Sequence, residues 1–375
     1  MSGPDTTVTT QVRPGRWRFA TAVEIPVSEV SATSPTANHM VVELYIAGPV
    51  QATGPVQGTF FEASPTADPV RGWVARKDLA PLLPKAIPVP MLIDEYQDSA
   101  WYRPVGTVAF IGEPAPKDVR QGKVGDCKLL SALQALAASP GGQAHLKRII
   151  ATVDKEKGTF SVRLRTNLTK GAQDGGFEFI PVDNYFPVTR GAGEVLSALY
   201  GRTTKDTGTF PIWPALLEKA MAMVGGGYQT LVEIKPGTLP DSTIFATLGI
   251  EPLGSPNTMI CTIKTGPAIK GFVVKQFSEG ATFVAAAGFR PHNWAVIGAD
   301  ENYLHLADPY SPPGVYEREE APTVVGENGI DVLWNRKLDK FPVRLEWNWV
   351  KDYVRVLTRF KTPPASTEGK DKEGD

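Results

Sequence analysis

Hydrophobic residues recur at helical spacing in two stretches of this chain. Leu129, Leu133 and Leu136 fall on one face of a helix that begins at Cys127 and stops before Pro140. Apolar residues between 212 and 223 mark a second helix, which is ended by three consecutive glycines. Both helices are therefore expected to pack into a core.

Apolar and polar residues alternate elsewhere, which predicts strands. Phe160, Val162 and Leu164 alternate, and so do residues 303–307, while an apolar strand follows the turn at His292. Short β-rich stretches between Gly and Pro turns occupy residues 16–19, 40–46, 58–61 and 72–74. Together with 36 glycines and 33 prolines, this pattern predicts a loop-rich α+β fold.

These patterns divide the chain into four parts. Residues 1–15 and 362–375 are polar, and we expect a disordered arm and a disordered tail there. Residues 16–90 are expected to form a small β domain that closes in a Pro-rich, semi-rigid linker. Its segment 72–79 is similar to the close of bacterial SH3-like barrels. Residues 91–361 are expected to form one larger α+β domain.

Candidate chemistry begins at the start of the first predicted helix. Cys127 lies there, and a thiol at a helix N-terminus is close to partial positive charge that favours the nucleophilic thiolate. Gln121, six residues upstream, carries an amide N–H₂ that can donate to a developing oxyanion. This segment is typical of a cysteine nucleophile with an oxyanion donor.

A base and its partner must come from far along the chain. His292 precedes one predicted strand and Asp308 follows the next, so adjacent strands could place the two side chains together. A cysteine and a histidine that are distant in sequence but adjacent in space are typical of cysteine hydrolases. His305 is a rival base, but it lies between two leucines, and Asp308 before a proline could be an ordinary turn residue.

The segments around these residues resemble the calpain cysteine protease family over about residues 92–360. The resemblance implies a papain-like fold with a helical lobe and a β-rich lobe. It also implies that Cys127 is the nucleophile, His292 the base, Asp308 its orienting partner and Gln121 an oxyanion donor. The matching segments are Trp101-x-Arg103-Pro104, Asp118-Val119-x-Gln121-Gly122-x-x-Gly125-Asp126-Cys127, Val182-Asp183-Asn184-Tyr185-Phe186-Pro187, Trp213-x-x-Leu216-Leu217-Glu218-Lys219-Ala220, His292-x-Trp294-Ala295-Val296 and Trp349-x-x-Asp352-Tyr353.

Three residues depart from the family pattern. Asp308 replaces an asparagine, Lys128 replaces the tryptophan after the nucleophile, and Tyr310 replaces a second tryptophan. The Asp308 carboxylate can still accept an imidazole N–H and would stabilise an imidazolium. Lys128 could lower the thiol pKa or be solvated.

Calcium is the metal that the resemblance raises, because the family core carries two calcium sites. Asp118 matches one ligand of the first site, but residues 210–212 replace the acidic ligand expected before the Trp213 helix. Calcium takes about 6–8 oxygen ligands. We therefore expect this site to be degraded and no cofactor to be required.

Composition limits the classes of partner. The hydrophobic content of 42% supports a full core, and a net charge of −1 gives no footprint for nucleic acid or an anionic membrane. Neither a signal peptide nor an apolar run of about 18 residues is visible. A disulfide between Cys127 and Cys261 would consume the nucleophile, so we expect a reducing compartment such as the cytoplasm, with delivery as an effector as a further hypothesis.

The main functional hypothesis is a calpain-like endopeptidase that acts on protein or peptide substrates. A related thiol amidase or acyl transferase would use the same residues. A catalytically inactive binding protein of the same fold is the alternative from another class. Under each hypothesis, the β domain at 16–90 could dock a partner or cover the cleft.

Overall fold

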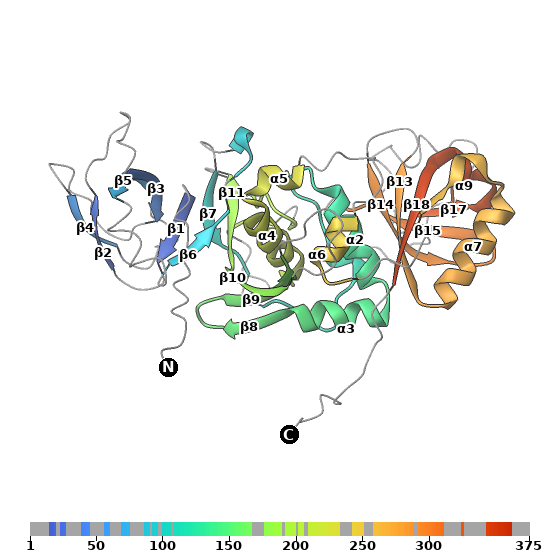
Figure 1. The fold of residues 1–375 in the computed structure, drawn as a ribbon, viewed down its shortest axis with the longest axis horizontal. Helices are drawn as coiled ribbons and strands as arrows, with labels where there is room; N and C mark the ends of the chain where they lie inside the picture. Colours follow the sequence, from blue (N-terminus) through green and yellow to red (C-terminus); the bar gives the residue numbers. More distant parts are fainter. Residues whose placement is uncertain are drawn as a thin grey trace, which may run out of the picture. The chain divides into compact units, whose positions relative to one another are not determined.

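The structure is a computed structural model, drawn in Figure 1. It forms two compact units, Met1–Met91 and Leu92–Asp375, which are described separately. The residues it describes are 15–19, 23–27, 39–45, 56–60, 69–75, 86–90, 92–96, 100–106, 108–166, 176–189, 192–199, 202–205, 209–232, 242–250, 258–287, 292–310, 324–325 and 343–361. The arm predicted at 1–15, apart from Gly15, and the tail predicted at 362–375 lie outside this set.

The first unit contains two sheets. A four-stranded sheet has the order β5-β3-β1-β6, and β2 pairs with β4 in the second sheet. The strands are β1 (Gly15–Phe19), β2 (Val23–Val27), β3 (His39–Tyr45), β4 (Val56–Phe60), β5 (Pro69–Ala75) and β6 (Ala86–Val89). Residues 86–89, which were expected to belong to the linker, instead form strand β6. It pairs antiparallel with β1 at the edge of its sheet, where a proline such as Pro88 is tolerated.

In the second unit, helix α2 (Cys127–Ala137) is buried along its whole length. Leu129, Leu133 and Leu136 are buried as predicted. The helix ends before Pro140, but Pro140 begins a second helix, α3 (Pro140–Ile149), that the sequence pattern did not reveal. A proline is well suited to the first helical position, and the Ser139 hydroxyl caps the helix by accepting from Gly142 N at 3.2 Å.

The second predicted helix is α4 (Trp213–Gly225), and it ends as expected at the run of glycines. Gly226 has φ 96°, a left-handed conformation that glycine adopts without strain. The short helices α5 (Tyr228–Val232) and α6 (Ser242–Thr247) follow. No helix within the described residues is long and apolar enough to cross a membrane.

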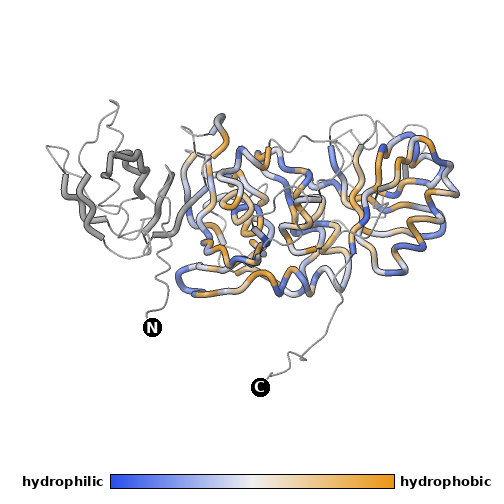
Figure 2. The backbone as a smooth tube through the Cα atoms, in the orientation of Figure 1, coloured by the Kyte–Doolittle hydropathy of each residue, from blue (hydrophilic) through white to orange (hydrophobic). Residues whose placement is uncertain are grey.

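Small sheets accompany these helices. β8 (Ile150–Asp154), β9 (Thr159–Arg165) and β10 (Phe177–Asp183) form one, and β7 (Ala100–Pro104) pairs with β11 (Tyr185–Thr189) in another. Phe160, Val162 and Leu164 of β9 are buried, which confirms the predicted alternation. The turn between β8 and β9 is hydrophilic, as the blue tip of this hairpin in Figure 2 shows.

A seven-stranded sheet has the order β12-β18-β13-β14-β15-β17-β16 and is antiparallel except at β16–β17. Helices α7 (Gly266–Ser278) and α9 (Trp347–Tyr353) pack on one face, and α2 contacts β13 and β14. In Figure 1, α2 lies on the side of the sheet opposite α7 and α9. The strands are β12 (Thr258–Ile260), β13 (Ala281–Ala287), β14 (Asn293–Ala299), β15 (Tyr303–Ala307), β16 (Val324–Val325), β17 (Val343–Glu346) and β18 (Val354–Lys361).

Three 3-10 turns complete the described elements: η2 (Asp94–Tyr96), η3 (Pro116–Asp118) and η4 (Cys261–Ile263). Cys261 begins the third of these turns. It is fully buried, and burial raises the pKa of its thiol to about 12. The mixture of helices and antiparallel sheets confirms the α+β class.

Candidate active site

Cys127 is the first residue of α2 and is only 3% exposed. The helix that it begins packs against β14, the strand that starts directly after His292. The Cys127 side chain lies close enough to the His292 imidazole to influence its charge. The structure therefore brings together two residues that are 165 positions apart in sequence.

His292 and Asp308 also meet. His292 Nε2 lies 2.8 Å from Asp308 Oδ1, and both side chains are largely shielded from solvent. The same carboxylate oxygen accepts a hydrogen bond from Tyr310 N at 2.8 Å, which fixes its direction. Because Nε2 faces the carboxylate, the other ring nitrogen, Nδ1, remains for the contact with Cys127.

The electrostatics of this cluster favour a charged imidazole. Burial of the ring opposes protonation, but the charge of Asp308 and the hydrogen bonds with Asp308 and Cys127 act more strongly together. They raise the pKa of His292 from 6.5 to about 10. Trp294 is 4% exposed and packs edge-to-face against the imidazole, with the two ring centroids 5.8 Å apart. It thereby shields the imidazole from water.

Gln121 lies on a segment that is joined to the Asp308 loop. Gln121 N donates to Pro309 O at 2.7 Å, and its side-chain Nε2 donates to Val124 O at 2.8 Å. A Cβ atom on Gly122 would lie 2.0 Å from a main-chain carbonyl oxygen, so only glycine fits there. The Gln-Gly pair thus holds the amide close to the start of α2.

A glutamine inside α2 makes a second connection. Gln134 Nε2 lies 3.3 Å from Pro116 O, 3.4 Å from Val119 O and 3.5 Å from Asp308 O. One fully buried amide therefore contacts both the approach to Cys127 and the Asp308 loop. No pattern in the sequence pointed to a role for this residue.

Two buried carboxyl groups next to Cys127 were also missed. Asp126 precedes Cys127 and lies close to Glu218 of α4, and each side chain is at most 1% exposed. Burial raises the pKa of both groups, and the charge of Asp126 raises that of Glu218 further. Two carboxyl groups in contact cannot both ionise at low cost, so the pair holds a proton.

The residue after Glu218 forms a buried ion pair. Lys219 donates to the Asp183 carboxylate and to Tyr185 O at 2.8 Å, and both charged side chains are fully buried. Asp183 and Lys219 belong to segments that carry the sequence resemblance, but the spacing gave no reason to pair them. This contact joins α4 to the turn between β10 and β11.

Asp118, the calcium candidate, uses its carboxylate for other contacts. Asp118 Oδ2 accepts from Ala115 N at 2.9 Å and from the Trp213 indole N–H at 3.0 Å. Its neighbours in the adjacent pocket include Lys117 and Arg120, which repel a cation. Within the described residues, no cluster of three His, Cys, Asp or Glu side chains could hold a metal ion. The residues present around Asp118 therefore do not fit calcium.

His305 and Lys128 are two further residues that the sequence raised. His305 Nε2 lies 2.7 Å from Asp300 Oδ2, so the rival base pairs with a different carboxylate from the one that contacts His292. Lys128 is 6% exposed, which is contrary to the solvated alternative considered for it.

Comparison with known proteins supports the resemblance. Residues 86–252 match the calpain family of cysteine proteases. Calpain-13 of Rattus norvegicus is 27% identical over 217 residues, which cover 54% of this chain and 30% of that relative. The chain thus spans less than a third of the relative's length. The family match includes Gln121 and Cys127, whereas His292 and Asp308 lie beyond it. These findings identify a calpain-like cysteine protease region in this chain.

Proposed function

We propose that the protein is a calpain-like cysteine endopeptidase in which Cys127 attacks a peptide carbonyl carbon. The observation that carries the proposal is the contact of His292 with both Cys127 and Asp308. In the proposed papain-like arrangement, the helical part and the seven-stranded sheet act as two lobes, with the substrate between them.

The raised pKa of His292 supports a protonated imidazole at neutral pH, which is the partner that a thiolate nucleophile requires. In the first step, the thiolate forms a C–S bond and the imidazolium gives its proton to the leaving amine. In the second, His292 takes a proton from water, hydroxide attacks the thioester, and the thiol is released. Asp308 holds the ring and stabilises its charged form throughout.

The oxyanion of each tetrahedral intermediate would be held by Gln121 and the Cys127 backbone N–H. An amide nitrogen carries two donors. One Gln121 N–H is directed to Val124 O, which leaves the second for the oxyanion.

We further propose that this chemistry needs no calcium, because the residues around Asp118 do not fit the ion. A protein or peptide is the proposed substrate, and the first unit is proposed to dock a partner or to cover the substrate site. Both cysteines are free thiols, which supports a reducing compartment such as the cytoplasm, reached directly or by delivery as an effector.

The test is intact-mass labelling with an epoxysuccinyl cysteine-protease probe, together with cleavage of an unstructured protein substrate. Labelling should occur in EDTA and be lost in Cys127→Ala and His292→Ala, while Cys261→Ser, the matched thiol control, should label normally. Cleavage should be abolished in Cys127→Ala. Cleavage that persists in a clean Cys127→Ala preparation would refute the proposal.

The other outcomes separate the alternatives. Labelling without release of new peptide ends would indicate a thiol amidase or acyl transferase. No labelling with or without calcium, also after removal of residues 1–90, would indicate a binding protein. Labelling only with calcium would overturn the metal-independent mechanism.

A further inference from the structure

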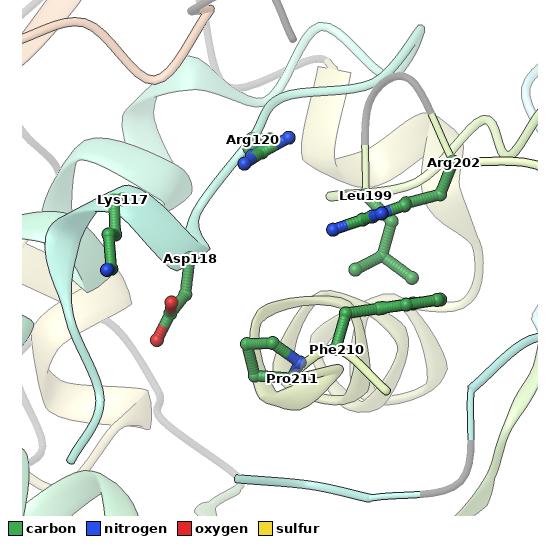
Figure 3. A pocket seen from close by; sticks show the side chains of 7 residues that line it. All are labelled: Lys117, Asp118, Arg120, Leu199, Arg202, Phe210 and Pro211. Carbon is green, nitrogen blue, oxygen red and sulfur yellow. The ribbon is translucent and has the colours of Figure 1, made fainter. Parts of the chain in front are cut away.

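A pocket of about 380 Å³ lies beside the approach to α2. Figure 3 shows that its side chains come from two separate stretches of the chain, one before Cys127 and one before α4. The lining residues are Lys117, Asp118, Arg120, Leu199, Arg202, Phe210 and Pro211.

The charge of this pocket is strongly positive. Lys117, Arg120 and Arg202 supply three cations, and Asp118 is the one acidic residue in the lining. The Asp118 carboxylate accepts hydrogen bonds from Ala115 N and from the Trp213 indole N–H. In Figure 3 this carboxylate points away from both guanidinium groups. The lining therefore has a formal charge of +2.

One arginine is held in place by an aromatic ring. The Arg202 guanidinium lies over Phe210, with Cζ 4.4 Å from the ring centroid. Stacking of this kind limits the freedom of the side chain and lowers the entropy lost when the guanidinium binds a ligand. Arg120 is placed by its backbone, which bridges to Leu199, and Figure 3 shows both guanidinium groups above the same hollow.

We propose that this pocket binds a phosphate group, either as a free small anion or on a phosphorylated peptide. The planar N–H donors of an arginine match phosphate oxygens, and Arg202, stacked on Phe210, presents such donors to the pocket. A phosphate monoester carries a charge of about −1.5 to −2 at pH 7, which matches the formal charge of the lining. Leu199, Phe210 and Pro211 form an apolar wall that could contact the group bearing the phosphate.

This proposal does not depend on peptidase activity, because it concerns binding alone. The pocket has the opposite charge from a calcium site, although Asp118 occupies a position where the resemblance implies a calcium ligand. Arg120 directly precedes Gln121, so the ligand would lie at the approach to the candidate active site.

Isothermal titration calorimetry with inorganic phosphate, a phosphoserine peptide and its unphosphorylated form tests the proposal. Arg202→Gln and Lys117→Gln each remove one cation from the lining. Lys205→Gln removes one from an exposed position outside the lining and is the matched control. We expect Arg202→Gln to weaken binding about 10-fold or more, as the loss of a charge-assisted contact implies. Lys205→Gln should change the Kd less than about 2-fold.

The two arms distinguish the sources of the phosphate. Equal affinity for inorganic phosphate and the phosphopeptide supports a free anion, and tighter binding of the phosphopeptide than of inorganic phosphate supports a protein ligand. The proposal is overturned if neither probe binds. It is also overturned if binding is the same in the wild type, Arg202→Gln and Lys117→Gln, whose exposed side chain can be replaced without disturbing the fold.

Discussion

Replacing Asp308 by asparagine separates the charge of this side chain from its shape. The amide oxygen can still accept from His292 Nε2 and from Tyr310 N, which now lie 2.8 Å from Asp308 Oδ1. The negative charge is lost. An opposite charge at this distance raises the pKa of the imidazole by about 1–3 pH units. We therefore expect the pKa of His292 to fall from about 10 by that amount.

The pH dependence of the free energy of unfolding should show the same loss of negative charge. The folded-state pKa of His292, about 10, lies above the ordinary value of 6.5. The stabilisation is thus complete below pH 6.5 and is lost as the pH rises through 10. For the wild type it amounts to at most about 5 kcal/mol, because one pH unit corresponds to about 1.4 kcal/mol. Asp308→Asn should flatten the fall in the free energy of unfolding over this range.

NMR of protein labelled with ¹⁵N-histidine measures the titration directly, since the chain has four histidines. In the wild type, the His292 ring should stay protonated through pH 8.5, and in Asp308→Asn its titration midpoint should be lower. His305, which pairs with Asp300 and not with Asp308, is an internal control, and its NMR signals should be the same in both proteins. An unchanged His292 midpoint in Asp308→Asn would contradict the electrostatic reasoning.

Three further changes test the surroundings of the site. Lys219→Met removes the cation that pairs with the buried Asp183 carboxylate and should lower the free energy of unfolding by about 3–5 kcal/mol in urea denaturation, whereas a loss below about 1 kcal/mol would contradict a buried ion pair. Burial raises the folded-state pKa of Asp126 from an ordinary 3.8 to about 7, so the folded state binds an extra proton and stability should fall as the pH rises between these values; Asp126→Asn, which removes the titrating group, should flatten that fall, and an unchanged pH profile of unfolding would argue against the buried proton. Gly122→Ala places a Cβ 2.0 Å from a carbonyl oxygen and should lower both the melting temperature and the rate of probe labelling, so wild-type values for both would contradict the close approach.

Local patterns in the sequence predicted the elements that carry the candidate site. The leucines of α2, the alternation in β9 and the glycines after α4 depend on spacing along one segment, which the sequence shows directly. His292 and Asp308 were placed together because two consecutive strands suggested it, and the structure has them in contact.

Contacts between segments distant in sequence were beyond such reasoning. The closeness of Asp126 and Glu218 depends on how α2 and α4 lie relative to each other, and no local spacing encodes that geometry. Pro140 was interpreted only as a stop, because a proline that ends one helix can also begin the next. Prolines likewise suggested a linker where β6 forms an edge strand.

The separation of Cys127 from its partners has a consequence for biosynthesis. About 180 residues separate Cys127 from Asp308, which takes roughly 10–35 s to synthesise at about 5–20 residues per second. β18, which pairs with β13 beside the strand that follows His292, is made later still. During translation the Cys127 thiol therefore exists for many seconds without His292 and Asp308 beside it. Under the proposed mechanism, a nascent chain has no active nucleophile until the seven-stranded sheet has been made.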